Sequence, residues 1–167
     1  MNPSTTQNNA LHLLPLLLLL TPPTLHATCY PSIRSTPDTQ FHLNPDANLV
    51  TDTTTQRQWQ RRTIGQHWNG TTCAGRPLRL TYAEAQAQLA DHPGWRLPTA
   101  AELHSLIERA CFYPAINRTQ FPATPPALFW SRSAGDGEAS QIAIDFHNAM
   151  EHPGYPQSQH AYLRLVR

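Results

Sequence analysis

Two short helical patterns lie in the middle of the chain. Thr81 and Thr99 each precede a glutamate by three positions, which is the spacing of a capping box. Beyond the second box, apolar residues recur with the i, i+3, i+4, i+7 spacing of one buried helix face: Leu103, Leu106, Ile107 and Ala110. The patterns predict one helix from about 81 to 91 and a second from 99 through 110. Pro98 favours an extended segment between them.

Alternating or clustered apolar residues predict strands on both sides of the helices. Short extended pieces are expected around 41–43, 49–50, 58–60 and 128–130, and alternation predicts two half-buried antiparallel strands, one around 142–146 and one around 161–165. Residues 147–159 are expected to form a long loop. Sixteen prolines and seven glycines favour long irregular connections. The predicted fold is α+β, with two short helices, a small twisted antiparallel sheet and long loops.

The first 27 residues have the pattern of a secretory signal peptide. An apolar run from Leu13 to Leu20 is followed by prolines and a small residue, Ala27. The run is shorter than the roughly 20 residues that a membrane-spanning helix needs. We therefore predict export to the periplasm or the cell surface, with residues 1–27 as signal peptide and 28–167 as one domain.

The charge of the chain excludes some partners. The formal net charge is +1 and charged residues make up 14% of the sequence, so no overall field attracts nucleic acid. All 12 basic residues are arginine. A bias of the coding sequence toward GC-rich codons is the preferred explanation of this composition. The alternative is selection for guanidinium groups, which form forked hydrogen bonds with carboxylates and sulfates.

The three cysteines, Cys29, Cys73 and Cys111, allow at most one internal disulfide. An exported chain meets an oxidising compartment, so one bridge is expected. No pair has the CxxC spacing of a redox or zinc motif, which favours a structural role for the cysteines.

The sequence contains no nucleophile elbow, phosphate loop or zinc-protease motif. A hydrolase would have to rely on Asp136, Glu138 or Asp145, which lie near a glycine-rich turn, where carboxylates are usually solvated. His104 and Glu108 are predicted to form a surface pair on the second helix. Three further histidines border the 147–159 segment and could together hold a metal: His147, His152 and His160. The preferred interpretation is a solvated loop that contains histidines. We predict no enzyme activity, cofactor or metal.

Aromatic and arginine side chains are the remaining candidates for ligand contact. Trp68 lies in a polar loop and is the best candidate for stacking on a ligand, whereas Trp59, Trp95 and Trp130 are expected in the core. Arg96 is expected to make a structural fork. The predicted anion-facing residues belong to the last strands: Arg132, Arg164 and Arg167.

Several motifs together resemble the C-terminal domain family of the Legionella collagen-like protein. In chain order they occupy residues 59–61, 68–73, 81–85, 94–103, 114–117, 121–122, 129–131 and 162–167. The resemblance implies a fold distantly like C-type lectins and the formylglycine-generating enzyme. It also implies adhesin-like binding of sulfated glycosaminoglycans.

The chain departs from this family in its cysteines. Members commonly carry a cysteine where this chain has Arg62, and that cysteine would pair with the position of Cys73. The resemblance therefore implies that Cys73 is free and that the bridge joins Cys29 to Cys111. The calcium motifs of sugar-binding C-type lectins are absent from the sequence.

The sequence as a whole predicts an exported, non-enzymatic binding module. The first hypothesis is an adhesin-like module that holds a carbohydrate or sulfated polysaccharide. The alternative is a protein-interaction accessory of a cell-envelope, pilus or secretion assembly, with the same loops contacting another protein.

Overall fold

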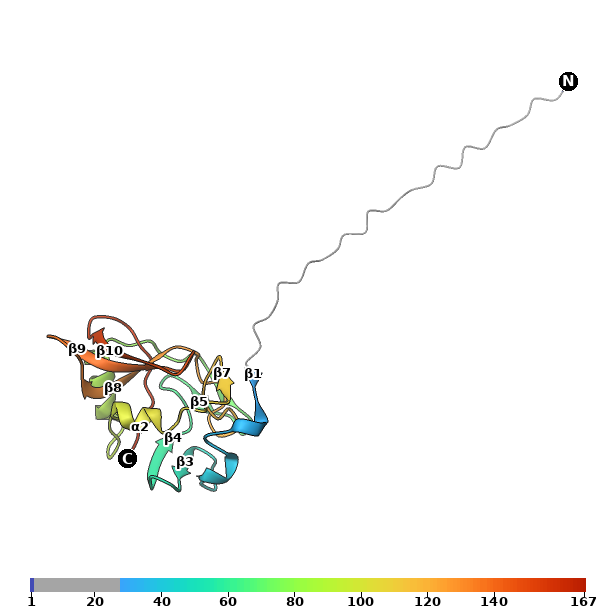
Figure 1. Ribbon diagram of the computed structural model, residues 1–167, viewed down its shortest axis with the longest axis horizontal. Helices are drawn as coiled ribbons and strands as arrows, with labels where there is room; N and C mark the ends of the chain where they lie inside the picture. The colour runs from blue at the N-terminus through green and yellow to red at the C-terminus, as the bar shows by residue number, and fades with distance from the viewer. Residues whose placement is uncertain (2–27) are drawn as a thin grey trace.

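The computed structural model describes Met1 and residues 28–167 (Figure 1). Apart from Met1, the predicted signal peptide lies outside the described residues. The architecture is mixed α/β, with short helices and several small antiparallel sheets. The α-helical segments are α1 (Tyr82–Ala87), which continues into the 3₁₀ turn η3 (Gln88–Asp91), and α2 (Ala100–His104). Two further 3₁₀ turns are η1 (Pro31–Ile33) and η2 (Asp38–Gln40).

The strands pair into four small sheets. The two larger ones have the orders β10-β9-β8 and β2-β3-β4, and the pairs β1-β7 and β5-β6 complete the set found in the described residues. The strand bounds are β1 (Thr28–Cys29), β2 (Phe41–Leu43), β3 (Leu49–Asp52), β4 (Arg57–Gln60), β5 (His67–Trp68), β6 (Cys73–Ala74), β7 (Cys111–Phe112), β8 (Leu128–Ala134), β9 (Ser140–Asp145) and β10 (Met150–Pro156). All these pairings are antiparallel. The expectation of an α+β chain with short helices and antiparallel strands is confirmed.

Both predicted capping boxes are present. The Thr81 hydroxyl accepts from the Glu84 amide and the Glu84 carboxylate accepts from the Thr81 amide. Thr99 and Glu102 make the same reciprocal pair at α2. Each box satisfies two amides that the first turn of a helix leaves unpaired, so these local motifs fix where the helices begin.

The prediction that the second helix runs through Ala110 is wrong. The helix ends at His104. Leu106 and Ile107 are buried as predicted, but Leu106 lies in the turn after the helix, and Ile107 pairs with Ile116 instead of continuing the helix. Cys111 is held extended in β7 by pairing with Cys29. A long-range strand pairing therefore stops a helix that the local apolar spacing favours.

The 147–159 segment is not the predicted loop. Its central part forms β10, which pairs with β9 and shifts register between His152 and Tyr155. Pro153 and Gly154 lie at that irregularity. Proline and glycine are tolerated in an edge strand and at a bulge, because no ladder hydrogen bond from the proline nitrogen is needed there.

The prediction of a half-buried strand around 161–165 is wrong: among the described residues this segment makes isolated bridges and no strand, and it is more deeply buried than predicted. Leu163, Arg164, Leu165 and Val166 are all fully buried. Val166 bridges both Trp59 of β4 and Arg96, so the tail lies between segments that are far apart in the sequence. In Figure 1 the C-terminus ends beside β4 and α2.

Two apolar clusters form the core. The first joins β3 and β4 to α2, β8 and β9; it includes Val50, Trp59, Leu103, Phe121, Phe129 and Ile144. The second packs the C-terminal tail under α1 and includes Ile64, Leu97, Trp130, Leu163 and Leu165. Trp59 and Trp130 are fully buried as predicted, and the Trp130 indole N–H donates to the Leu80 carbonyl oxygen over 2.7 Å.

The disulfide implied by the family resemblance is confirmed. Cys29 and Cys111 are bonded, and they face each other in the β1-β7 pair. Cys73 is free and buried. Burial raises the pKa of the Cys73 thiol above its usual range, which keeps it protonated at neutral pH.

Candidate ligand groove

Arg164 is not the anion-facing residue that we predicted. Its side chain is fully buried. The guanidinium donates to the carbonyl oxygens of Gln60 and Arg61 and to the Thr124 hydroxyl, and it lies 4.8 Å from the centre of the Phe121 ring. Burial lowers its pKa to about 10, so the group is still charged at neutral pH. Arg164 therefore ties the C-terminal tail to the segment after β4 and cannot meet a ligand at the surface.

Arg132 and Arg167 are both exposed, as an anion site would require. The Arg167 guanidinium lies 4.8 Å from the centre of the Trp95 ring and its Nε donates to the Gln58 side chain over 2.8 Å. The Arg132 amide donates to the Pro98 carbonyl oxygen, which anchors its backbone and leaves its side chain at the surface.

Trp68 lies in β5 and is half-buried. The guanidinium of Arg61 lies 3.9 Å from the centre of the indole ring. Arg61 itself is buried and donates to the carbonyl oxygens of Thr119 and Gln120. One face of the Trp68 ring is therefore already covered by a fixed cation–π contact.

Arg96 makes the predicted structural fork. Its two terminal nitrogens donate to the two Glu102 oxygens. The hydrogen bonds from Arg96 and from the Thr99 amide hold the pKa of Glu102 at about 2, far below its usual range. The charge of Arg96 is thus paired with that of Glu102 and is not available to an anionic ligand.

The expected surface pair of His104 and Glu108 does not form. Glu108 is buried and accepts from the amides of Ser35, Thr36 and Ala110, whereas His104 pairs with Glu151 at the surface. Burial raises the pKa of Glu108, but the amide hydrogen bonds together outweigh it and hold the pKa below its usual range. The pair was predicted from i, i+4 spacing on a helix, but the helix ends at His104, so the two side chains diverge.

A groove of about 250 Å³ lies beside the C-terminal tail. Its walls are Arg76, Pro77, Leu78, Arg79 and Tyr162. The side chains of Arg76, Leu78 and Arg79 are exposed, and the Tyr162 ring is half-buried against Phe129, with 5.7 Å between ring centres. The groove therefore combines two guanidinium groups with an apolar and aromatic wall.

Backbone contacts fix the two walls relative to each other. The Leu78 amide donates to the Ile64 carbonyl oxygen, and Leu80 pairs with Ala161. Arg79 also donates to the His160 carbonyl oxygen over 3.1 Å. The Arg-Pro-Leu-Arg segment and the tail are thus held side by side before any ligand binds.

Gly65 makes this close packing feasible. Its φ is +92°, and a Cβ placed there would lie 2.6 Å from the Arg76 carbonyl oxygen and 2.7 Å from the Leu78 side chain. Only glycine combines this backbone conformation with so close a neighbour. The position of the groove wall therefore depends on the residue at 65.

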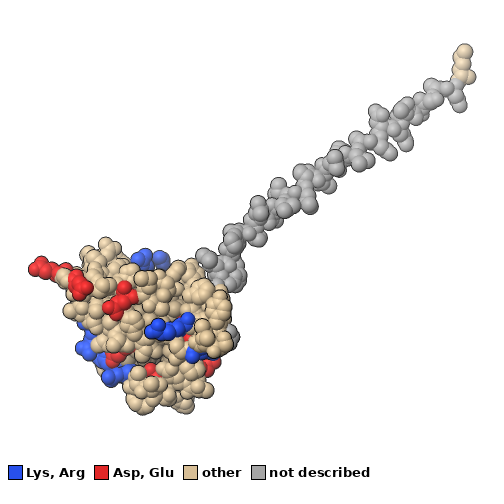
Figure 2. Space-filling view, in the orientation of Figure 1, with Lys and Arg blue, Asp and Glu red and all other residues tan. Residues whose placement is uncertain are grey.

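Basic groups are distributed in separate patches. On the face shown in Figure 2, arginine atoms form isolated groups among neutral and acidic atoms. On that face, anion recognition would have to be local, through neighbouring guanidinium groups, since the view shows no broad positive surface there.

The other chemical candidates are not gathered into a site. In residues 28–167, no group of three or more His, Cys, Asp or Glu side chains is arranged to hold a metal. Asp136 and Glu138 are exposed in the turn after β8, and Asp145 accepts from the His147 amide. Across the same part of the chain, no helix is long and apolar enough to cross a membrane.

Sequence patterns did not indicate the groove, because its two walls are 83 positions apart at their closest, between Arg79 and Tyr162. The Arg-Pro-Leu-Arg stretch carried one local signal, an apolar residue between two arginines in a polar loop. Nothing in the sequence around Tyr162 indicated a ligand contact, because an aromatic residue in a predicted terminal strand is usually part of a core.

Comparison with known proteins places the chain in a family. No curated protein and no solved structure matches it significantly. The family model described as the Lcl C-terminal domain matches residues 48–167, which include both walls of the groove and exclude β1, β2 and the turns near the N-terminus. The chain belongs to the Lcl C-terminal domain family.

Proposed function

We propose that this chain is an exported, non-enzymatic, adhesin-like module that binds a sulfated polysaccharide in the Arg76–Tyr162 groove. The observation that carries the proposal is the pairing of two exposed guanidinium groups, Arg76 and Arg79, with the apolar wall of Leu78 and Tyr162. Guanidinium forks suit sulfate and carboxylate groups, and an aromatic ring suits the apolar face of a sugar.

Family membership supports the same proposal, because the resemblance implies adhesion to sulfated glycosaminoglycans. We also propose that the small antiparallel sheets and short helices form a C-type-lectin-like scaffold, in which connecting loops present the ligand. The groove fits this arrangement, since its walls are a loop and the C-terminal tail.

Export is part of the proposal. It is supported by the predicted signal peptide and by the Cys29–Cys111 disulfide, because structural disulfides persist mainly in oxidising compartments. The final location, periplasm or cell surface, would follow from fractionation of cells that produce the chain.

The direct test is retention on immobilised heparin across a salt gradient. The variant with Arg76→Gln and Arg79→Gln is compared with a matched control carrying Arg109→Gln and Arg118→Gln, which also removes two exposed arginines and, within residues 28–167, breaks no ion pair. We expect the groove variant to elute at clearly lower salt than the control, because each lost ion contact weakens a salt-sensitive complex. Equal elution of the two variants would refute the groove as the binding site.

A glycan array with the unchanged chain, at two salt concentrations, identifies the sugar. Sulfated or uronic-acid glycans are expected, with signals that weaken as salt increases. An empty array, together with one envelope protein captured by crosslinking, would instead support the protein-interaction alternative.

A further inference from the structure

We propose that the Cys29–Cys111 disulfide is an exchange site for anionic thiols, and that its opening releases the N-terminal strap, residues 28–36. The strap precedes the part of the chain that matches the family model. The proposal concerns a different region from the glycan groove and does not depend on it.

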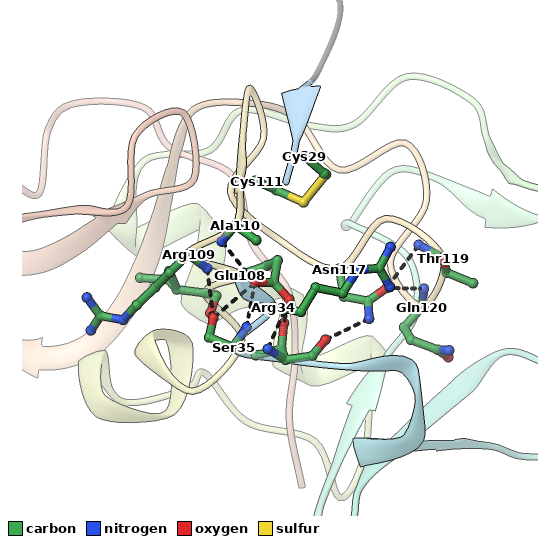
Figure 3. The surroundings of a disulfide bond; sticks show 12 residues. Cys29, Arg34, Ser35, Glu108, Arg109, Ala110, Cys111, Asn117, Thr119 and Gln120 are labelled. Atoms are coloured by element: carbon green, nitrogen blue, oxygen red, sulfur yellow. Dashed lines mark hydrogen bonds between the residues drawn. A yellow bond between two sulfur atoms is a disulfide. The ribbon is translucent and has the colours of Figure 1, made fainter. Parts of the chain in front are cut away.

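The largest group of side-chain hydrogen bonds that holds the strap is at one buried carboxylate, and further hydrogen bonds join Tyr30 to Ala110, Ser35 to Ile107 and Arg109, and Thr36 to Asn117. Glu108 is 1% exposed and accepts from Ser35 and Thr36, through the backbone amide and the hydroxyl of each, over 2.7 to 3.1 Å. The fifth donor is the Ala110 amide. Four of these five donors come from the strap. Figure 3 shows Ser35 and Ala110 beside the Glu108 carboxylate.

The disulfide is the covalent part of the same attachment. A cavity of about 100 Å³ opens beside it, and both cysteines belong to its lining. Cys29 is half-buried whereas Cys111 is 6% exposed, so Cys29 is the more accessible sulfur. A small thiol can therefore approach Cys29 without unfolding of the core.

Two arginines, Arg34 and Arg118, line this cavity and both are exposed. Arg34 is weakly paired with Asp38, at 3.5 Å, and within residues 28–167 the structure gives Arg118 no ion-pair partner. The negative charge of Glu108, in the cavity lining, is already compensated by its five donors. Arg109 extends away from the disulfide (Figure 3). The uncompensated charge at the cavity mouth is therefore positive.

Positive charge at this point favours thiol–disulfide exchange with negatively charged thiols. The thiolate attacks Cys29 Sγ and forms a mixed disulfide, while the Cys29–Cys111 bond breaks and its electron pair leaves on Cys111 Sγ, which then takes a proton from water. A second thiolate attacks the sulfur of the first thiol and releases Cys29 as a thiolate. In total, two thiols are oxidised to one disulfide and the protein disulfide is reduced.

Reduction leaves the strap held by non-covalent contacts, which include the hydrogen bonds to Glu108 and the ring contact between Tyr30 and Phe112. The β1-β7 pair is two residues long on each side, and without the covalent link its closure has to offset the entropy of ordering the strap. Departure of the strap would expose the Glu108 carboxylate to water. Opening of the disulfide is therefore expected to expose Glu108 and the surface under the strap to solvent, while the two core clusters stay packed.

The test compares three small thiols that differ in charge: mercaptoethanesulfonate, mercaptoethanol and cysteamine. Formation of the mixed disulfide is followed by intact mass on the whole chain, and peptide mapping locates the adduct. Each rate constant is divided by that of the same thiol with a small uncharged disulfide, to remove differences in intrinsic reactivity. We expect the sulfonate to react about tenfold faster than cysteamine on this scale, with the adduct on Cys29.

The variant with Arg34→Gln and Arg118→Gln should reduce this preference to about twofold, and Arg132→Gln should leave it unchanged. An equal rate for all three thiols, or an unchanged preference in the double variant, would overturn the arginine part of the proposal. A rate independent of thiol concentration would show that exchange requires global unfolding, and would overturn the whole proposal.

Release of the strap is measured by hydrogen exchange of the Ser35 and Thr36 amides, which are bonded to Glu108 in the oxidised chain. After reduction these amides should lose protection, while the Trp130 amide, which donates to the Tyr162 carbonyl oxygen, keeps it. Continued protection of both strap amides would show that reduction does not release the strap.

Discussion

Arg96 and Glu102 are joined by two parallel hydrogen bonds of 2.8 and 2.6 Å, one to each carboxylate oxygen. The same carboxylate closes the capping box with the Thr99 amide. Arg96 also pairs through its backbone with Val166 of the C-terminal tail. One glutamate therefore links the start of α2 to the segment that holds the tail.

The Arg96–Glu102 pair predicts an acid-sensitive contribution to stability. The pKa of Glu102 is about 2 in the folded chain, against an ordinary value of 4.5, so the unfolded chain binds a proton more readily. The contribution is complete above pH 4.5 and is lost as the pH falls toward 2. Urea unfolding of Glu102→Gln, which retains a capping residue, should show a loss of about 2 kcal/mol at pH 7.

The same comparison near pH 2 is the control. The gap between the original chain and Glu102→Gln should narrow there, because the carboxylate becomes protonated in both states. A gap of the same size at both pH values would show that the charge of Glu102 does not contribute.

Arg164 is predicted to matter for folding and not for binding. Replacing it with methionine leaves the carbonyl oxygens of Gln60 and Arg61 and the Thr124 hydroxyl without their donor in a buried site. We expect a loss of about 3 kcal/mol in the free energy of unfolding. Arg132→Met, at an exposed position, should change it by less than about 0.5 kcal/mol, as measured by chemical denaturation.

The glycine at position 65 allows a matched test of groove geometry. Gly65→Ala places a methyl group against Arg76 and Leu78, whereas Gly70→Ala, at a similar φ of +94°, meets nothing within 4 Å. Both variants carry the backbone strain of about 1 kcal/mol. Only Gly65→Ala should lose about 2 kcal/mol more by thermal unfolding and also bind heparin less tightly. Equal effects of the two changes would contradict the steric argument.

The disulfide should contribute substantially to stability. It closes a sequence separation of 82 residues, and loss of the link in Cys29→Ser with Cys111→Ser should cost about 4 kcal/mol through the entropy of the unfolded chain. Cys73→Ala, which removes only a buried thiol, should cost about 1 kcal/mol. Denaturant titration under non-reducing conditions measures the free energy of unfolding of both variants. Similar losses in the two variants would show that the disulfide stabilises the chain no more than a buried thiol does.

Thiol labelling gives an independent check on Cys73. In the folded chain a thiol reagent should leave Cys73 unmodified, because the side chain is buried and its pKa is raised. In denaturant one thiol per chain should react. Rapid labelling without denaturant would contradict the observed burial.

Local motifs predicted much of the secondary structure. The capping boxes at Thr81 and Thr99 were correct because each depends on contacts between residues three apart. The strand around Trp59 and the antiparallel strand around Ile144 were also correct, since alternation reports which face is buried. Predictions that extended a local pattern over a longer stretch were wrong. The helical spacing of Leu106 and Ala110, for example, does not continue α2 beyond His104.

Burial of polar residues could not be predicted in the same way. Glutamate and arginine are residue types that usually lie at the surface, but Glu108 and Arg164 are both buried and form hydrogen bonds with distant segments. An isolated buried charge is unfavourable, and only the complete set of partners makes its burial possible. Those partners are brought together by the fold.

The sequence by itself determined the starts of the helices, the strands β2, β3, β4, β8 and β9, the cysteine count and the family to which the chain belongs. Each of these depends on neighbouring residues or on the order of motifs. Tertiary structure alone decided where α2 ends, that Arg164 is internal, and that Arg76 and Arg79 face Tyr162. Contacts between residues far apart in the chain depend on chain closure and packing, which local patterns do not encode.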